Sequence, residues 1–468
     1  MTDTSRVWRF AALMFLIVVG VRVYVALAGP AAIDTLAVDD ALITYRYAEN
    51  IAAGFGFVYN SGEHVLGTTT PLYTILLALF AIVGLSIPLV SLIMGLLASG
   101  LTGLTLYFFS LRLKLGAFSI APPLLYAVWP NAILSDISGL EVPLFTLGAI
   151  LFFYLVMIGR YRLSALSAGL LALVRPEGLL LIALLFIFKY MIKRRKLRDV
   201  IVEAAIIFAI VTPWLIFAWI FFGSPIPNSI GAKLALYSGF SGGSFLERLY
   251  RLLSLHSVFG WIALIGWMWG LAYLLMRRFW GWLESLYMAI TITALAVSDV
   301  NLFFWYKAPL GPLFALFIGA GIAGALRLAL NLSGYPRIVW LSAALIILTA
   351  LPFLGARVER TRLFTKAQSE IYLNQHKRAG EYLNEHARGG DIVVAEDIGY
   401  LGYTYRGRII DRDGLVSPEA IAMGRAVYRS IVPVSTTTRS SPVLKSRLMI
   451  LVSLPSSRTK ASIQSSSR

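Results

Sequence analysis

Cysteine is absent from the 468-residue sequence, and histidine occurs only four times. The chain therefore has no disulfide and no thiolate-bound metal site, and cysteine usage leaves no trace of the redox state of its compartment. Charged residues are scarce as well. They make up 14% of the chain, against roughly 25% in soluble domains, and 58% of the residues are hydrophobic. This composition, with a mean hydropathy of +0.76, excludes a water-soluble enzyme.

Apolar segments follow one another from residue 10 to residue 354, and a bilayer crossing needs roughly 20 such residues. They lie near 10–28, 71–84, 87–111, 117–135, 142–158, 163–174, 178–192, 200–222, 256–276, 282–298, 309–329 and 336–354. The segment 71–84 is too short to cross comfortably and is typical of an interfacial or re-entrant helix. We therefore predict an all-α polytopic membrane protein with about eleven transmembrane helices plus this segment.

Acidic residues are also few, since 24 Asp and Glu face 41 Lys and Arg, for a formal net charge of +17. With an inside N-terminus and eleven crossings, the basic clusters fall on the inner side, as the positive-inside rule asks. These clusters are Arg112 with Lys114, Arg160 with Arg162, the run from Lys193 to Arg198, Arg277 with Arg278, and Arg327 with Arg337. We therefore predict a multi-pass plasma-membrane protein that has a cytoplasmic N-terminus, contacts membrane lipid and binds no nucleic acid.

The chain divides into three predicted parts. Residues 1–354 form the transmembrane module, whose first external loop spans 29–86. Residues 355–431 read as a small extracytoplasmic α/β domain, with a helix over 366–387 and strands over 391–395 and 408–411. Residues 432–468 are rich in Ser, Thr and Arg and are predicted to be a disordered tail.

The first external loop carries the adjacent carboxylates Asp39 and Asp40 at the start of a predicted amphipathic helix that ends before Gly54. Asp40 is the expected N-cap. Only one of two adjacent carboxylates is needed as a cap, which leaves the other for general-base chemistry or metal binding. A divalent cation (Mg, Mn or Ca) held by Asp39 and Asp40 is an open alternative, because hard carboxylates beside a phosphate suit such ions.

These motifs and others along the chain resemble the GT-C superfamily of polyprenyl-phosphate-sugar-dependent glycosyltransferases, in particular relatives of the mycobacterial terminal arabinofuranosyltransferase. The matching stretches, in order, are 39–77, 138–145, 175–178, 227–229 with 232–233, and 411–418. The sequence departs from the family at 65–70, where an acid and an aromatic residue are missing. It departs again at 304–309, where Lys307 stands close to the place of an expected Arg. Both departures concern the identity of the sugar and leave the acidic pair intact.

The resemblance implies inverting transfer of a sugar, best matched by arabinofuranose, from a polyprenyl-phosphate-sugar donor to a hydroxyl of a glycan or lipid-linked acceptor outside the cell. Asp39 or Asp40 would be the general base, and cations would neutralise the phosphate as the glycosidic bond breaks. Candidate substrate-binding residues are Glu141, Arg175, Lys233, Lys307, Trp305 and His64.

Each candidate also has a structural interpretation. Lys233 and Lys307 fit snorkelling lysines, Arg175 fits a turn pair with Glu177, Glu141 fits a helix N-terminus, and Trp305 fits an interfacial aromatic belt.

Three alternatives to this function remain open from the sequence. The first is a family 39-like mannosyltransferase or an aminoarabinosyltransferase, with the same mechanism and a protein or lipid A acceptor. The second is a transporter or lipid flippase, which the ionisable residues do not favour because they lie near the ends of spans and not at their midplane. The third is a non-catalytic binding scaffold.

Overall fold

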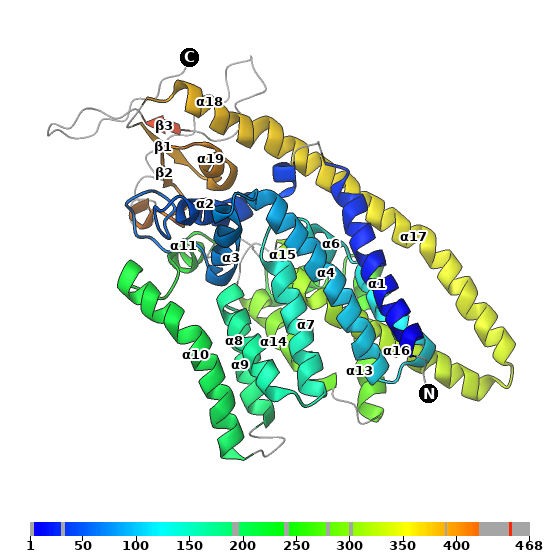
Figure 1. Ribbon diagram of the computed structural model, residues 1–468. Helices are drawn as coiled ribbons and strands as arrows, with labels where there is room; N and C mark the ends of the chain where they lie inside the picture. The colour runs from blue at the N-terminus through cyan, green and yellow to red at the C-terminus, as the bar shows by residue number, and fades with distance from the viewer. Residues whose placement is uncertain are drawn as a thin grey trace.

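The computed structural model describes residues 4–29, 33–189, 196–237, 243–277, 281–298, 303–388, 391–420 and 449–451. Helices form a bundle, and a small sheet with two helices covers one of its ends (Figure 1). The predicted fold class, an all-α polytopic membrane protein with a small α/β part, is confirmed.

Six helical segments of the described chain are long and apolar enough to cross a membrane. An α-helix rises 1.5 Å per residue, so these segments exceed the roughly 20 residues that a bilayer requires or come close to it. They are α1 (Thr4–Ala26), α4 (Ile87–Arg112), α10 (Leu197–Phe222), α13 (Val258–Met276), the run α15 (Phe304–Lys307), η4 (Ala308–Leu310) and α16 (Gly311–Ser333), and α17 (Pro336–Ile371). The protein is thus a multi-pass membrane protein.

Five apolar helices are shorter than 18 residues: α3 (Pro71–Ile82), α7 (Val142–Met157), α8 (Tyr161–Val174), α9 (Gly178–Ile187) and α14 (Gly281–Val297). The short α3 agrees with the predicted interfacial or re-entrant segment. The other four coincide with predicted crossings, although length and composition alone support only six crossings, or seven if a bent pair counts as one. The number eleven therefore stays a prediction.

The predicted segment 117–135 is not one helix. It consists of η2 (Gly116–Ile120), α5 (Ala121–Ala127) and α6 (Pro130–Asp136), with a bend of 63° before α6. Pro130 explains the break, because the residue before a proline is pushed out of the helical conformation; Trp129 is indeed extended. Arg22 of α1 is fully buried against this break, where its guanidinium donates to the carbonyls of Tyr126 and Ala127 and its Nε lies 3.0 Å from Asp136 Oδ2.

The predicted domain boundary at residue 355 falls inside a continuous helical rod. From α17 the helix continues through a π-helical stretch, η5 (Tyr372–Lys377), into α18 (Arg378–His386). Both predicted strands are present, as β1 (Ile392–Ala395) and β2 (Arg408–Asp411), and they pair in parallel with Val393 opposite Ile409. The predicted disordered tail lies outside the described residues except for β3 (Met449–Leu451), which pairs antiparallel with β1.

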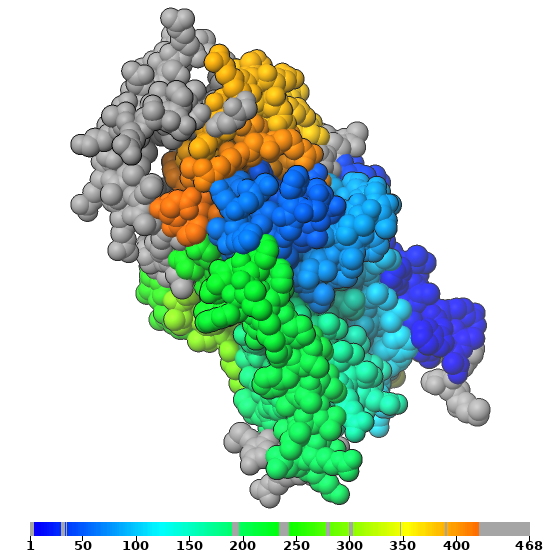
Figure 2. All heavy atoms as spheres, turned by 60° about the vertical axis from the view of Figure 1, so that its left-hand side comes forward, coloured from blue at the N-terminus to red at the C-terminus, as the bar shows by residue number. Residues whose placement is uncertain are grey.

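The remaining elements gather at the end of the bundle that carries the sheet. They are η1 (Ile33–Leu36), α2 (Asp39–Ala52), α11 (Asn228–Tyr237), α12 (Phe245–Leu252) and α19 (Ile398–Thr404). In Figure 2 the segment around α2 and α3, in blue, lies directly under the C-terminal α/β part, in orange, and above α10, in green. The predicted site at Asp39 and Asp40 therefore lies between the C-terminal α/β part and the helical bundle.

Candidate functional site

The two adjacent carboxylates at the start of α2 have different surroundings. The carboxylate of Asp39 accepts hydrogen bonds from the backbone N–H groups of Gly399 and Tyr400, both at 2.8 Å. It therefore satisfies the first orphan donors of α19, which begins at Ile398. Asp40 does not cap α2, contrary to prediction. A cap at Asp40 would start the helix at Ala41, whereas α2 begins two residues earlier, at Asp39, and its N-cap Val38 makes no side-chain hydrogen bond.

Asp39 is held in an environment that disfavours its negative charge. Burial is the main reason that the pKa of Asp39 rises to about 7, and the charges of Asp397 and Asp40 add to the rise. The two backbone hydrogen bonds act in the opposite direction, because they favour the ionised form. Asp39 is thus a half-buried carboxylate with both oxygens bonded to α19.

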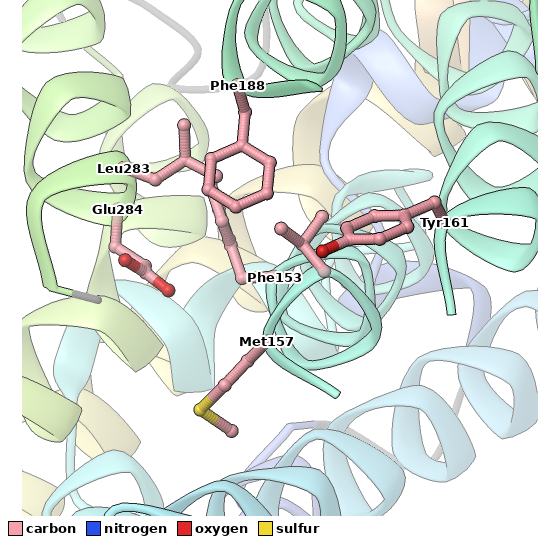
Figure 3. Close-up of a pocket in the computed structure, with 7 residues that line it drawn as sticks. Phe153, Met157, Tyr161, Phe188, Leu283 and Glu284 are labelled. Carbon is pink, nitrogen blue, oxygen red and sulfur yellow. The ribbon is translucent and has the colours of Figure 1, made fainter. Parts of the chain in front are cut away.

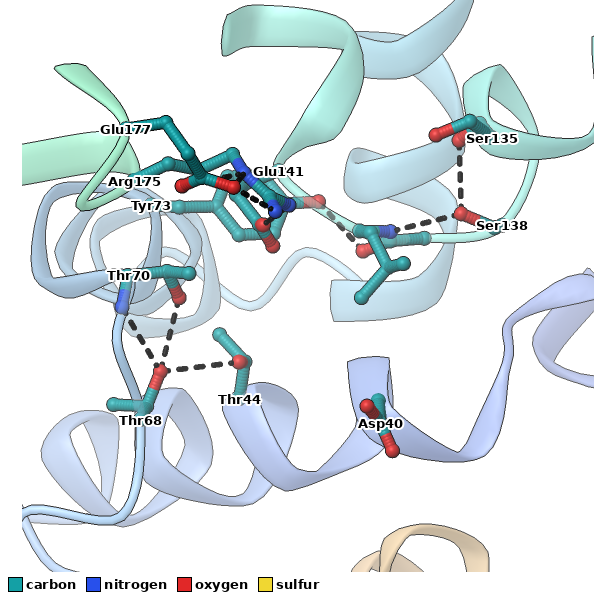
Figure 4. A network of polar contacts seen from close by, with 12 residues as sticks. Asp40, Thr44, Thr68, Thr70, Tyr73, Ser135, Ser138, Glu141, Arg175 and Glu177 are labelled. Atoms are coloured by element: carbon teal, nitrogen blue, oxygen red, sulfur yellow. Dashed lines mark hydrogen bonds and ion pairs between the residues drawn. The ribbon is translucent and has the colours of Figure 1, made fainter. Parts of the chain in front are cut away.

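Asp40 is accessible. Its side chain is 39% exposed, and its Oδ2 lies 3.7 Å from the Nζ of Lys233, which belongs to α11 and is 32% exposed. Thr44, one helical turn further along α2, shares the face of Asp40, and its hydroxyl lies 3.4 Å from that of Thr68. Thr68 in turn contacts the Thr70 hydroxyl at 2.9 Å, so a row of hydroxyls extends beside Asp40 (Figure 4).

Arg175, itself buried, is the centre of a partly buried ionic cluster at the α8–α9 turn. Its Nη1 donates to Glu141 Oε1 at 2.6 Å and its Nη2 to Glu177 Oε1 at 2.7 Å. Figure 4 shows this cluster above Asp40. Burial raises the pKa of Glu177, but the charge of Arg175, and less strongly that of Lys233, brings it below its ordinary value. Lys233 therefore acts electrostatically on both Asp40 and the cluster, and the structural pair expected between Arg175 and Glu177 is present.

The segment that carries Trp305 and Lys307 packs against α6. Trp305 is 8% exposed, stacks on Phe303 at 4.3 Å between ring centroids, and belongs to the same apolar cluster as Val38 and Ala41. Its surroundings are those of a core residue. Lys307 is only partly buried, and no ion-pair partner for it exists in the described part of the chain. Of the predicted phosphate-binding cations, Arg175 is thus held between two carboxylates, and Lys233 lies beside Asp40.

The candidate His64 points to another part of the surface, where its ring stacks on Phe221 at the end of α10, with 4.1 Å between centroids. It is exposed, and nothing brings it to Asp40. The structure thus joins Asp39, Asp40, Glu141, Arg175, Lys233 and the 303–307 segment around one end of α2 and leaves His64 aside.

Sequence reasoning missed two features of this region. The threonines 44, 68 and 70 escaped notice, although the four-residue spacing of Asp40 and Thr44 on a predicted helix was a usable signal. Arg46 and Asn60 were missed as well; Arg46 donates to carbonyls of Tyr59 and Gly402, and Asn60 exchanges hydrogen bonds with the backbone of Ile409. No local pattern indicates those contacts.

A protein-held divalent cation does not fit the donors at Asp39 and Asp40. Both oxygens of Asp39 already accept backbone hydrogen bonds, which leaves Asp40 alone. Over the whole described chain, no group of three or more His, Cys, Asp or Glu side chains is arranged to hold a metal ion.

A solved structure with a similar fold is that of ArnT from Cupriavidus metallidurans bound to undecaprenyl phosphate. The two chains are 14% identical, the match covers 90% of this chain and 89% of ArnT, and the TM-score is 0.54. The chain therefore shares its overall fold with ArnT. At this identity the match shows the fold alone, and it supports the GT-C part of the resemblance without supporting the arabinofuranosyltransferase part.

The C-terminal residues 366–459 match a family model described as a domain of unknown function, DUF8728. No curated protein matches the chain.

Proposed function

We propose that the protein transfers a sugar from a polyprenyl-phosphate-sugar donor to an acceptor hydroxyl, with Asp40 as the general base. The observation that carries this proposal is the unequal use of the acidic pair. Asp39 is half-buried and bonded to α19 through both oxygens, whereas Asp40 makes no such bond, has a side chain that is 39% exposed and faces Lys233. The GT-C fold supports the same reaction class, since ArnT was found with undecaprenyl phosphate.

In the proposed reaction the acceptor oxygen attacks the anomeric carbon from the face opposite the phosphate. The acceptor proton moves to Asp40. The bond between the anomeric carbon and the phosphate oxygen breaks, its electron pair stays on that oxygen, and the configuration inverts. Lys233 and Lys307 neutralise the phosphate charge that develops, as fixed cations do most effectively in a water-poor site. Arg175 holds Glu141 and Glu177 in place around them.

The test compares two isosteric variants of the full chain in lipid nanodiscs. Polyprenyl-phosphate-arabinofuranose is the first donor and a short arabinan the first acceptor, because the sequence resemblance favours this sugar. Asp40→Asn is expected to lower kcat by about 100-fold or more, the usual contribution of a general base, with an unchanged Tm. Asp39→Asn is expected to lower Tm and to leave kcat within about 10-fold of the parent, well above the Asp40→Asn value.

Three results would each change a part of this proposal. Full activity of Asp40→Asn would overturn its role as base. Turnover only with polyprenyl-phosphate-mannose or polyprenyl-phosphate-aminoarabinose would keep the reaction class and replace the sugar, with a protein or lipid A as the acceptor to assay next. Loss of activity on treatment with EDTA would show a divalent cation in the reaction and would contradict a purely protein-based site.

A further inference from the structure

A second polar region lies at the end of the bundle away from the sheet. There α7, α8, α9 and α14 enclose a cavity of about 40 Å³. Aromatic and aliphatic side chains line it, with a single carboxylate, Glu284 of α14. Figure 3 shows the Glu284 carboxylate and the Tyr161 hydroxyl directed into the same hollow. A water molecule needs roughly 10–15 Å³ of such space, so the cavity has room for about three water-sized groups.

One oxygen of the Glu284 carboxylate has no hydrogen-bond partner in this cavity. It is 4% exposed, and within the described chain its Oε2 accepts no hydrogen bond. A buried carboxylate in an apolar site is costly unless it is paired. The buried lysine of the region, Lys189, is already paired with Glu203, and both side chains are at most 3% exposed. The cavity therefore offers a carboxylate that no cation of the described chain neutralises.

A larger cavity of about 470 Å³ adjoins the first, and Tyr161 lines both. The basic side chains of Arg160, Arg162 and Lys189 line it together with the acids Asp199 and Glu203. Arg160 and Arg162 are exposed, and neither guanidinium has an ion-pair partner in the parts of the chain that the structure describes. Leu163, which is 47% exposed, lies at the same wall.

We propose that these adjoining cavities bind the headgroup of a phospholipid with a primary ammonium, that is, a phosphoethanolamine headgroup. The ammonium occupies the small cavity beside Glu284, and the phosphate lies at Arg160 and Arg162. Three water-sized positions correspond to the three heavy atoms of an aminoethyl group. Aromatic walls attract a cation, and guanidinium groups suit phosphate because they donate in a planar fork.

The occupant is a membrane lipid because of where the larger cavity lies. It is formed at the first turns of α8 and α10, and in Figure 1 the start of α10 is at the end of the bundle opposite the sheet. This is the level at which a bilayer places its headgroups if the apolar helices cross it. The exposed Leu163 beside Arg162 gives the acyl chains an apolar contact that a soluble phosphate ester would not use.

The experiment counts bound lipid on the purified full chain by native mass spectrometry, with dioctanoyl phosphatidylethanolamine, phosphatidylcholine and phosphatidylglycerol at equal concentrations. The parent is expected to retain the ethanolamine lipid at least 10-fold better than the choline lipid, whose methylated cation has no N–H donor. Glu284→Gln removes that preference and leaves phosphatidylglycerol binding unchanged. The double variant Arg160→Gln, Arg162→Gln is expected to lose the ethanolamine lipid and phosphatidylglycerol. The control Arg112→Gln, at a basic residue that does not line either cavity, is expected to keep both of these lipids.

Met157→Phe is a second variant that fills the small cavity without changing a charge, and it is expected to abolish the ethanolamine preference as well. An unchanged preference in both Glu284→Gln and Met157→Phe would overturn the proposal. So would equal retention of the ethanolamine and choline lipids by the parent. Competition by free phosphoethanolamine at the same concentration as the lipid would assign the site to a soluble ligand and overturn its lipid occupant. The measurement needs no turnover, so it stands apart from the proposed glycosyl transfer.

Discussion

Two neighbouring side chains of the same type do different work in this protein, and their surroundings decide which. The Asp39 carboxylate is half-buried and bonded to the first turn of α19, so it fixes the C-terminal part onto the start of α2. Asp40 is oriented by the same helix but remains accessible beside Lys233. Because Asp39 anchors the start of α2 to α19, it also fixes the direction of the Asp40 side chain. We therefore assign Asp39 a positioning role.

The raised pKa of Asp39 leads to a prediction about stability and pH. The folded protein binds the Asp39 proton more tightly than the unfolded chain does, since burial raises the pKa from 3.8 to about 7. The stabilisation of the folded state by protonated Asp39 is therefore largest below pH 4 and is lost as the pH rises towards 7. We expect the Tm of the parent, measured in detergent, to fall between pH 5 and pH 7 more steeply than that of Asp39→Asn.

Asp411 is the control for this measurement, because burial also raises its pKa to about 7 and it titrates in the same range. Asp411→Asn should remove its own part of the slope and leave the part due to Asp39. Identical pH profiles for the parent and Asp39→Asn would show that Asp39 does not titrate in this window.

At the scale of elements, broken helices recur where polar groups enter the bundle. The break between α5 and α6 exposes carbonyls of Tyr126 and Ala127, and Arg22 satisfies both. The α8–α9 turn holds Arg175 between two carboxylates, and it is tight: a Cβ on Gly178 would lie 2.4 Å from the backbone nitrogen of Ala172. Free backbone groups are tolerated inside a membrane bundle only when side chains or neighbouring backbone satisfy them.

Removal of the guanidinium at the α5–α6 break tests this view. Arg22→Met leaves the buried Asp136 without its cation and both carbonyls without a donor, and breaking a buried pair from one side costs about 3–5 kcal/mol. We expect a large fall in Tm. The double variant Arg22→Met, Asp136→Leu removes the stranded charge and should recover part of the loss. A single variant as stable as the parent would contradict the structural role of Arg22.

The sequence predicts the elements better than their connections. Within the described residues, every predicted apolar segment is mostly helical, because hydropathy is a local property. Pro130 was an overlooked local signal for the break within 117–135, and the continuation of α17 beyond Gly355 had no hydropathy signal because its exposed turns are polar. The capping of α19 by Asp39 joins residues 360 positions apart, so no spacing rule could have separated Asp39 from Asp40.

At the scale of the whole molecule, the C-terminal part is joined to the site loop through buried polar contacts. Arg46 of α2 is 7% exposed, and its guanidinium donates to carbonyls of Tyr59, Gly402 and Gly407. Asn60 pairs with the backbone of Ile409 in β2. In Figure 2 the blue surface of this segment and the orange surface of the C-terminal part meet. Because Arg46 and Asp40 share one helix, we expect the attachment of the C-terminal part to control the geometry of the site.

Arg46→Met tests that attachment. The methionine keeps much of the apolar volume and removes every donor, so the carbonyls of Gly402 and Gly407 lose buried partners at a cost of about 1–3 kcal/mol each. We expect proteolysis of the segment 398–411 to become at least 10-fold faster and sugar transfer to fall. The control is Arg408→Gln, which removes an ion pair with Glu63 that is 46% exposed on the arginine side and is expected to contribute less than about 1 kcal/mol. Equal proteolysis rates for the two variants would mean that Arg46 does not hold the C-terminal part in place.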